Sequence, residues 1–314
     1  MATSSKRGAE SKAAATLATQ RKRLSVPKAY KMYVGGAFIR SESGRYYQVS
    51  GMTKGSADAE VVNVPLGSRK DARDAVLAAK TAQHGWSSRT AFNRGQILYR
   101  FAEVLESRHD EFVTSLVRAG ASKADAQVEV DSAVDRALWY AGIADKVSAL
   151  VASHNPVSGP HFGFTLPEPT GLVAIVAPES PALLGLVSTI MPVIVSGNTC
   201  IVVAGESDPR TAVIFCECLA TSDLPGGVVN VITGRAKELG PHLAKHREVN
   251  ALDAWSADAE LRTQLEREGA GSVKRVKTHD ARATVALRDE QAGQGLGYVE
   301  RFLEMKTVWH PVGV

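Results

Sequence analysis

The stretch from residue 168 to residue 203 constrains the fold of this chain more than any other. Residues 171–176 form a short apolar, β-branched run, which is typical of a strand buried on both faces of a parallel sheet. A proline-rich loop, an apolar helix and a second apolar strand at 199–203 follow. Gly197 and Asn198 suit the tight turn between helix and strand, because both residue types tolerate positive φ. This order of elements predicts half of a dinucleotide-binding sheet.

The basic charge of the chain is concentrated at its amino-terminal end. The formal net charge is +4, but residues 1–31 alone hold eight Lys or Arg and one Glu, so the remainder is acidic. Residues 1–29 are poor in large apolar side chains, and we expect a disordered basic tail. A partner-docking helix over residues 10–23 is the alternative. Nucleic-acid binding by Arg21, Lys22 and Arg23 is not expected, because no fold motif accompanies them.

Composition argues against the membrane and secreted classes. No run of about 18 apolar residues exists, and there is no hydrophobic signal region, so we expect a cytoplasmic protein without a membrane partner. Three cysteines cannot build a secreted disulfide framework. Cys200 falls in a predicted buried strand, and Cys216 and Cys218 fall on a predicted helix.

Long helical patterns precede the sheet. Ser68 and Asp71 form a capping box that opens a predicted helix running to about Trp86. Apolar periodicity predicts a second helix over residues 90–118 and a third over residues 122–151.

Strands and shorter helices are predicted on both sides of that region. Residues 33–38 and 46–49 are expected to pair around Gly44. After residue 203 the pattern predicts helices at 209–220, 234–246 and 256–268, strands at 228–232, 273–276 and 284–287, and a glycine-rich linker at 291–297.

Several motifs follow one another in a recognisable order. They are EPTGLVAIVAP from Glu168, MPVIVSGNT from Met191 and DLPGGVVNVITG from Asp223, flanked by residues 30–49 and 302–313. Together they resemble the NAD(P)-dependent aldehyde dehydrogenase superfamily. The resemblance implies an α/β fold with a Rossmann-like parallel sheet of the aldehyde dehydrogenase type. It divides the chain into a tail (1–29), amino-terminal strands and helices (30–143), an oligomerisation hairpin (144–167), the cofactor-type domain (168–255), a degenerate remnant or linker (256–298) and a carboxyl-terminal oligomerisation strand (299–314).

The catalytic domain of that superfamily has no counterpart here. The resemblance places it between the cofactor domain and the tail, where it carries the cysteine nucleophile in a Gly-Gln-x-Cys context. Only about fifty residues separate Trp255 from Lys306, and none is cysteine. That length is too short for a further substantial domain. We therefore expect a member of the superfamily that lacks the catalytic domain and the catalytic cysteine.

The remaining catalytic positions are degenerate. Pro178, Glu179 and Ser180 match the family's Pro-Trp-Asn, so Ser180 stands at the oxyanion position and Glu179 adds a negative charge beside it. The general-base motif Glu-Leu-Gly-Gly is absent from residues 274–283, where Asp280 is the one weak substitute. We expect no catalytic residue.

The cofactor positions are also altered. The family's Lys-Pro-Ala-Glu reads as residues 203–206, which leaves Glu206 without the lysine, and Phe-Thr-Gly-Ser reads as residues 254–257 without the glycine. Pro178, Glu206 and Gly234 are the residues left to contact a cofactor. NAD(P) binding is possible, but no cofactor is expected. His242 and His246 lie four apart on a helix without a third ligand, so no metal is expected either.

The tail FLEMKTVWHPVG keeps its form although the domain before it is missing. In the resembled family such a tail and hairpin add strands to the catalytic-domain sheet of a neighbouring subunit. Lys306, Thr307, Val308 and Trp309 are the predicted oligomerisation residues. We expect an inactive subunit that assembles with a full-length, active aldehyde dehydrogenase paralogue and stabilises or regulates it. The alternatives are a working NAD(P)-dependent aldehyde dehydrogenase with an atypical site, and a regulator that senses NAD(P).

Overall fold

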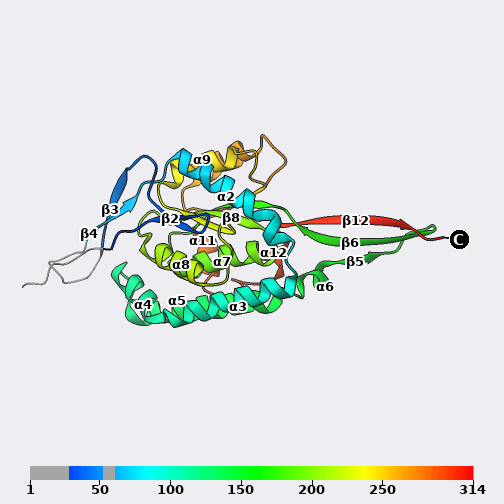
Figure 1. The fold of residues 1–314 in the computed structure, drawn as a ribbon, viewed down its shortest axis with the longest axis horizontal. Coiled ribbons are helices and arrows are strands. Elements are labelled where there is room, and N and C mark those ends of the chain that lie inside the picture. The colour runs from blue at the N-terminus through cyan, green and yellow to red at the C-terminus, as the bar shows by residue number, and fades with distance from the viewer. Residues whose placement is uncertain (1–27, 52–60, 314) are drawn as a thin grey trace, which may run out of the picture.

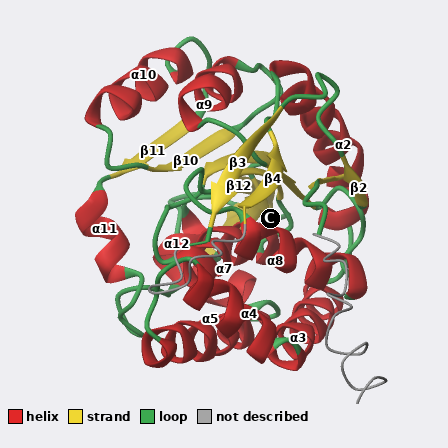
Figure 2. Ribbon diagram, turned by 90° about the vertical axis from the view of Figure 1, so that its left-hand side faces the viewer, coloured by secondary structure: helices red, strands yellow, loops and turns green. Residues whose placement is uncertain are grey.

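A seven-stranded sheet forms the centre of the molecule (Figures 1 and 2). The structure, a computed structural model, describes residues 28–51 and 61–313. The predicted basic tail and its alternative helix at 10–23 lie almost entirely outside these residues. The strand order is β11-β10-β7-β8-β9-β1-β2. The first five strands are parallel and β1 joins them antiparallel, which confirms the predicted α/β fold. The strands are β1 (Met32–Val34), β2 (Ala37–Ile39), β7 (Leu172–Val176), β8 (Thr199–Val203), β9 (Val229–Ile232), β10 (Ala251–Trp255) and β11 (Arg275–His279).

Helices cover both faces of the sheet because successive side chains of a strand point to opposite sides. Val173 and Ile175 of β7 face one apolar cluster, and Leu172, Ala174 and Val176 face the other. The first cluster draws on α3 (Ala91–Ser107), α4 (His109–Arg118), α5 (Lys123–Ile143), α7 (Ala182–Val195) and α8 (Arg210–Thr221). The second draws on α2 (Arg69–Ser87), α9 (Ala236–Lys245) and α10 (Ala259–Gly269).

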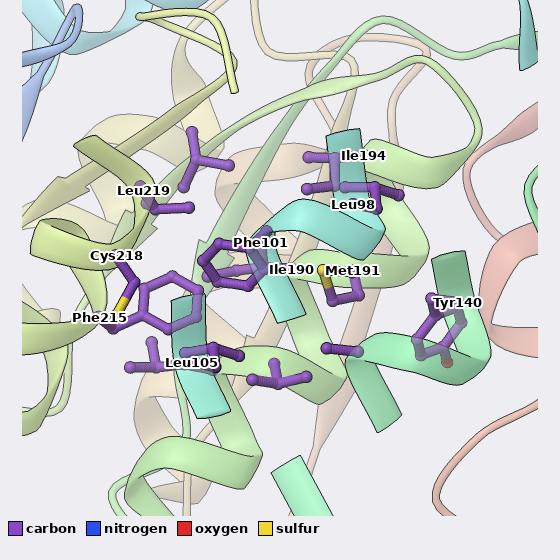
Figure 3. Close-up of a cluster of buried hydrophobic side chains, with 14 of the residues drawn as sticks. Leu98, Phe101, Leu105, Tyr140, Ile190, Met191, Ile194, Phe215, Cys218 and Leu219 are labelled. Atoms are coloured by element: carbon purple, nitrogen blue, oxygen red, sulfur yellow. The ribbon is translucent and has the colours of Figure 1, made fainter. Parts of the chain in front are cut away.

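The larger cluster is closed by aromatic packing between α3 and α8. Phe101 and Phe215 meet edge to face, with ring centroids 5.3 Å apart. Figure 3 shows them beside Leu105 of α3 and Ile190 of α7. All four side chains are fully buried, so they pack α3, α7 and α8 together on this face of the sheet.

The sequence predicted where the helices begin more accurately than where they end. Ser68 caps α2 in a complete capping box with Asp71, as predicted, and Thr90 and Ser122 cap α3 and α5. The single helix predicted over residues 90–118 is wrong, because the chain breaks at Arg108 into α3 and α4. The third predicted helix likewise ends at Ile143, and a short α6 (Val147–Val151) follows it.

The predicted strand pair around Gly44 is also wrong. β1 pairs with β2 through a turn at Gly35 and Gly36, whose φ angles of 62° and 87° suit a two-residue hairpin. β3 (Tyr46–Ser50) pairs instead with β4 (Val61–Pro65) in a separate two-stranded sheet. Gly44 is the turn that carries the chain from one sheet to the other.

A long three-stranded sheet projects from the body of the molecule (Figure 1). It contains β5 (Ser153–Asn155), β6 (His161–Pro169) and β12 (Leu303–Pro311), which we call the arm. β12 runs antiparallel to β6 from the pair Leu303 and Pro169 to the pair Pro311 and His161. The hairpin and the terminal strand predicted from the sequence therefore exist as strands of one sheet.

The chain between β10 and the arm is short but structured. It forms α10, β11, α11 (Ala281–Ala286) and α12 (Leu296–Glu300). The strand predicted at 284–287 is wrong, because Asp280 caps α11 there by accepting bonds from the amides of Arg282 and Ala283. β11 pairs with β10 along its whole length, so the sheet extends past residue 255. The proposed domain boundaries themselves stay a prediction.

Asn198 holds the base of the arm against the sheet. Its side-chain oxygen accepts a bond from the amide of Gly171 (2.7 Å), and its amide nitrogen donates to the carbonyl of Phe302 (2.8 Å). Asn198 does not adopt positive φ, whereas Gly197 does, at 93°. The conformational role predicted for both residues therefore belongs to Gly197 alone. Among the described residues, no helix is both long and apolar enough to cross a bilayer.

Candidate functional site

The carboxyl ends of five parallel strands meet at one edge of the sheet. In open α/β sheets, ligands bind in the crevice outside these ends, which makes this edge the candidate site. The loops after β7, β8 and β9 bring together the four residues predicted from the sequence, Pro178, Ser180, Glu206 and Gly234. Whether any of them contacts a cofactor stays a prediction.

Glu179 joins two of these loops. Its carboxylate accepts bonds from the backbone amides of Glu206 (2.8 Å) and Ser207 (3.0 Å) and from the Ser207 hydroxyl (2.5 Å). A Cβ added at Gly205 would lie 3.1 Å from the same carboxylate. Adjacent backbone amides of this kind are what a bound anion uses. Here the protein's own side chain occupies them.

Other amide groups at this edge are capped in the same way. Glu129 of α5 accepts bonds from the amides of Leu183 (2.8 Å) and Leu184 (3.4 Å) at the start of α7. Asp258 caps α10, and Asp280 caps α11. A phosphate approaching these helix starts would meet a carboxylate where it needs an N–H donor. The starts of α8 and α9 lie at the same edge, and no side-chain cap within the described residues covers them.

Glu129 is nearly fully buried, with 7% of its surface exposed. Burial raises the pKa of this carboxyl, and the hydrogen bond from the Leu183 amide and the charge of Arg288 oppose that rise. The capping geometry is thus maintained at some cost in desolvation.

Pro178 and Gly234 lie in closely packed surroundings, and Glu206 lies near a basic side chain. Pro178 is buried against α7, where a Cβ at Gly185 would lie 2.6 Å from its ring. Gly234 has a φ of 140° and lies against Gly67, whose amide donates to the carbonyl of Thr233 (2.8 Å). The Glu206 side chain is 3.8 Å from Arg235.

Ser180, at the expected oxyanion position, has a cationic neighbour. Nη2 of Arg288 donates to its hydroxyl at 3.2 Å, and Nη1 of Arg288 lies 3.9 Å from Glu129. Arg288 belongs to the segment that connects α11 with α12. The sequence reasoning did not identify this residue, because it has no counterpart in the resembled motifs.

A second feature missed from the sequence is a buried cluster at the ends of β10 and β11. Nε2 of His279 lies 2.9 Å from Oδ1 of Asp253, and Trp255 donates to Oδ2 of Asp253 at 2.7 Å. The rings of His279 and Trp255 stack at 3.8 Å with an interplanar angle of 9°. The alternation of Asp253 and Trp255 on one strand face was the available signal. The strand expected to lead to the general base thus ends on a histidine held by a carboxylate.

None of the three cysteines reaches this edge as an activated thiol. Cys200 lies in β8, and Cys216 and Cys218 lie on α8; all three are buried. Burial raises the pKa of each thiol, that of Cys218 to about 12. A nucleophilic cysteine needs a lowered pKa, so these thiols behave as small apolar side chains.

The weaker candidates also find structural explanations. Asp280 caps α11, and the hydrogen bond from Arg282 lowers its pKa, which is the opposite of what a general base requires. The rings of His242 and His246 are 6.1 Å apart, and the pKa of each is lowered, mainly by burial. Within the described residues, no group of three metal-ligating side chains comes together.

The comparison with known proteins agrees with the geometry of the sheet. The sequence pattern of the aldehyde dehydrogenase family matches residues 40–277. The chain belongs to this family. Hydroxyisobutyraldehyde dehydrogenase of Mycolicibacterium austroafricanum is 31% identical over 247 residues, which are 78% of this chain and 47% of that protein. Cytosolic 10-formyltetrahydrofolate dehydrogenase of Mus musculus is 30% identical over 237 residues, 74% of this chain and 26% of that protein.

Solved structures of the family share the fold. The NAD-dependent aldehyde dehydrogenase of Sinorhizobium meliloti superposes with a TM-score of 0.76 at 26% identity, over 83% of this chain and 52% of that chain. The chain thus spans about half, or less, of the length of these aldehyde dehydrogenase relatives. Between β11 and β12, where the resemblance places the catalytic domain, it has only α11 and α12.

Proposed function

We propose that this chain is a subunit without dehydrogenase activity of its own, which assembles with a full-length, active paralogue of the aldehyde dehydrogenase family and stabilises or regulates it. The main support for this proposal is the position of the arm. It extends away from the body as a three-stranded sheet, while the connection between β11 and β12 is too short to hold a domain that could receive such an arm.

The arm has the surface of a docking element. Phe162, Leu166 and Val308 are each more than two fifths exposed, and Trp309 is 62% exposed. Along the outer edge of β12, no strand of the described chain supplies a partner. Such an edge favours pairing with a strand of another chain, and uncovered it favours aggregation. The resemblance implies that the receiving sheet belongs to the catalytic domain of a full-length paralogue.

The candidate site supports the absence of independent catalysis. The three thiols are buried with raised pKa values, and the carboxylates of Glu179 and Glu129 occupy backbone amides that could otherwise bind an anion. The proposal therefore includes no NAD(P) binding by this chain alone. Calorimetric titration with NAD at millimolar concentration tests it, with no heat of binding expected. Saturable binding would favour an NAD(P)-sensing regulator.

The enzyme alternative has an equally direct test. Aldehyde-dependent NADH formation by the purified chain should be absent. Activity that disappears in one of the variants Cys200→Ala, Cys216→Ala or Cys218→Ala, while the other two retain it, would establish a working dehydrogenase and overturn the proposal.

Assembly is tested by co-expression with the paralogue, followed by size-exclusion chromatography with light scattering. The variant Val308→Asp places a charge on the arm and should weaken co-elution at least tenfold. Val128→Asp is the matched control, because Val128 is 65% exposed on α5, away from the arm. The proposal also places both subunits in the cytoplasm, where free thiols persist; fractionation of cells checks this.

A further inference from the structure

A cavity of about 490 Å³ lies between the turn after β2 and the β3–β4 sheet. Its lining residues fall within 28–30, 40–46 and 61–65, so none of them belongs to the loops of the candidate site. Ligand pockets for small molecules commonly measure about 300–1,000 Å³. The cavity is therefore large enough for a small organic molecule.

The charged side chains that line this cavity, among the described residues, all have one sign. Lys28, Arg40 and Arg45 line it, and the described lining includes no Asp or Glu. Lys28 is engaged with Glu217 at 2.7 Å. Neither Arg40 nor Arg45 forms an ion pair within the described part of the chain. Two guanidinium groups without a carboxylate partner favour an anionic ligand, which they can bind through several N–H donors.

The turn that carries the two arginines is held in place. The amide of Gly44 donates to the carbonyl of Ser41 (3.0 Å), so Arg40 and Arg45 flank a closed turn. The Ser41 hydroxyl donates to Asp71 at 2.8 Å, and the amide of Glu42 donates to the same carboxylate at 3.1 Å. Asp71 is 2% exposed and also caps α2. Because a buried anchor fixes the turn, little backbone ordering is required when a ligand binds.

Apart from Ser41 and Asn63, the rest of the described lining is apolar or aromatic. Tyr30 and Tyr46 contribute rings, and Val61, Val62 and Pro65 contribute aliphatic surface. Tyr46 is 60% exposed, so its ring is accessible to a ligand. A flat ring stacks on such a surface, whereas a fully hydrated inorganic ion gains nothing from it.

We propose that this cavity binds a small organic anion that carries a flat ring. Arg40 and Arg45 contact the anionic group, and Tyr46 contacts the ring. The anionic group is either the carboxylate of an aromatic acid or the phosphate of a mononucleotide. Both present oxygens to the guanidinium groups and a ring to Tyr46, so the two are separated by experiment.

Isothermal titration calorimetry of the full chain distinguishes the two classes of anion, with 1-naphthoate as the aromatic carboxylate and 5′-AMP as the mononucleotide. The neutral counterparts, 1-naphthylmethanol and adenosine, are titrated in parallel. We expect at least one anion to bind, its neutral counterpart to bind at least tenfold more weakly, and the affinity to fall with added salt. Binding of one anion identifies its class, and binding of both establishes only the shared chemistry.

Variants locate the binding site. The double variant Arg40→Ala/Arg45→Ala should lose at least tenfold in affinity for the anion that binds, and Tyr46→Ala several-fold, with circular dichroism confirming that each is folded. Arg100→Ala is the matched control, because Arg100 lies on α3 and, within the described residues, forms an ion pair only with Glu103. The proposal is overturned if neither anion binds at millimolar concentration, if a neutral counterpart binds equally well, or if the double variant binds like Arg100→Ala.

Discussion

Glu179 and Ser207 connect two loops at the carboxyl edge of the sheet. One Glu179 carboxylate oxygen receives both the hydroxyl (2.5 Å) and the backbone amide (3.0 Å) of Ser207. In a cofactor-binding member of the family, the matching sequence position is a tryptophan, as the resemblance implies. A carboxylate of the protein itself therefore stands where the family has an apolar ring, and it accepts hydrogen bonds from the loop after β8.

Removing that anion should loosen the loop. Glu179→Ala removes three hydrogen bonds from a partly exposed site, so we expect a loss of about 1 kcal/mol in the free energy of unfolding. Amide hydrogen exchange at Glu206 and Ser207 should accelerate, measured by mass spectrometry. Glu290→Ala, at an exposed site, serves as the control. Unchanged exchange at both amides would show that Glu179 does not hold the loop.

Glu129 should make stability depend on pH. Burial raises its pKa in the folded state above the ordinary value of 4.5, so the folded protein keeps this proton to higher pH than the unfolded chain does. The resulting contribution to stability is present below about pH 4.5 and is lost as the pH rises through the folded-state pKa. Urea unfolding between pH 4 and pH 7 checks this.

The variant Glu129→Gln isolates that contribution, because it keeps an acceptor oxygen for the Leu183 amide but cannot ionise. Its stability should fall less than that of the wild type as the pH rises over this range. Identical pH profiles for the two proteins would contradict the assignment.

The cluster of Asp253, Trp255 and His279 should contribute strongly to stability. Asp253→Ala leaves a buried imidazole and a buried indole N–H without their acceptor, so a loss of about 2–3 kcal/mol is expected. His279→Ala should also be costly, because it removes a ring stacked on Trp255 and leaves one oxygen of the buried Asp253 carboxylate without its partner. Urea unfolding of the two single variants and of the double variant Asp253→Ala/His279→Ala forms a double-mutant cycle. Additive losses would mean that the two residues do not act together.

The buried thiols should be unreactive in the folded protein. Because burial raises the pKa of Cys200, Cys216 and Cys218, a disulfide reagent such as dithionitrobenzoate should modify none of them at pH 8. All three should react in denaturant. A cysteine that reacts within seconds in the native protein would identify an activated thiol that the structure does not show.

Sequence patterns predicted those parts of the fold that depend on local chemistry. The capping box at Ser68 and the buried run at 171–176 each determine a local structure, and both were predicted correctly. The break at Arg108 was not predictable, because the apolar periodicity of α3 continues into α4. The partner of β3 was missed because strand pairing depends on contacts distant in sequence.

The candidate site also combines features that local sequence motifs predict with contacts that depend on the tertiary fold. Motif positions singled out Pro178, Ser180, Glu206 and Gly234, which the loops after β7, β8 and β9 place at one edge of the sheet. They could not indicate that Glu129, from a helix more than forty residues earlier, caps α7, nor that Arg288 lies beside Ser180. Both contacts connect elements that only the tertiary fold brings together.

The mass of the complex formed with a full-length paralogue tests the central claim most directly. Co-expressed and purified through a tag on this chain, the two proteins should co-elute at a defined stoichiometry by light scattering. The catalytic cysteine should come only from the paralogue, and Val308→Asp should weaken the complex at least tenfold while Val128→Asp preserves it. A soluble monomer or homodimer of this chain that excludes the paralogue would contradict the account.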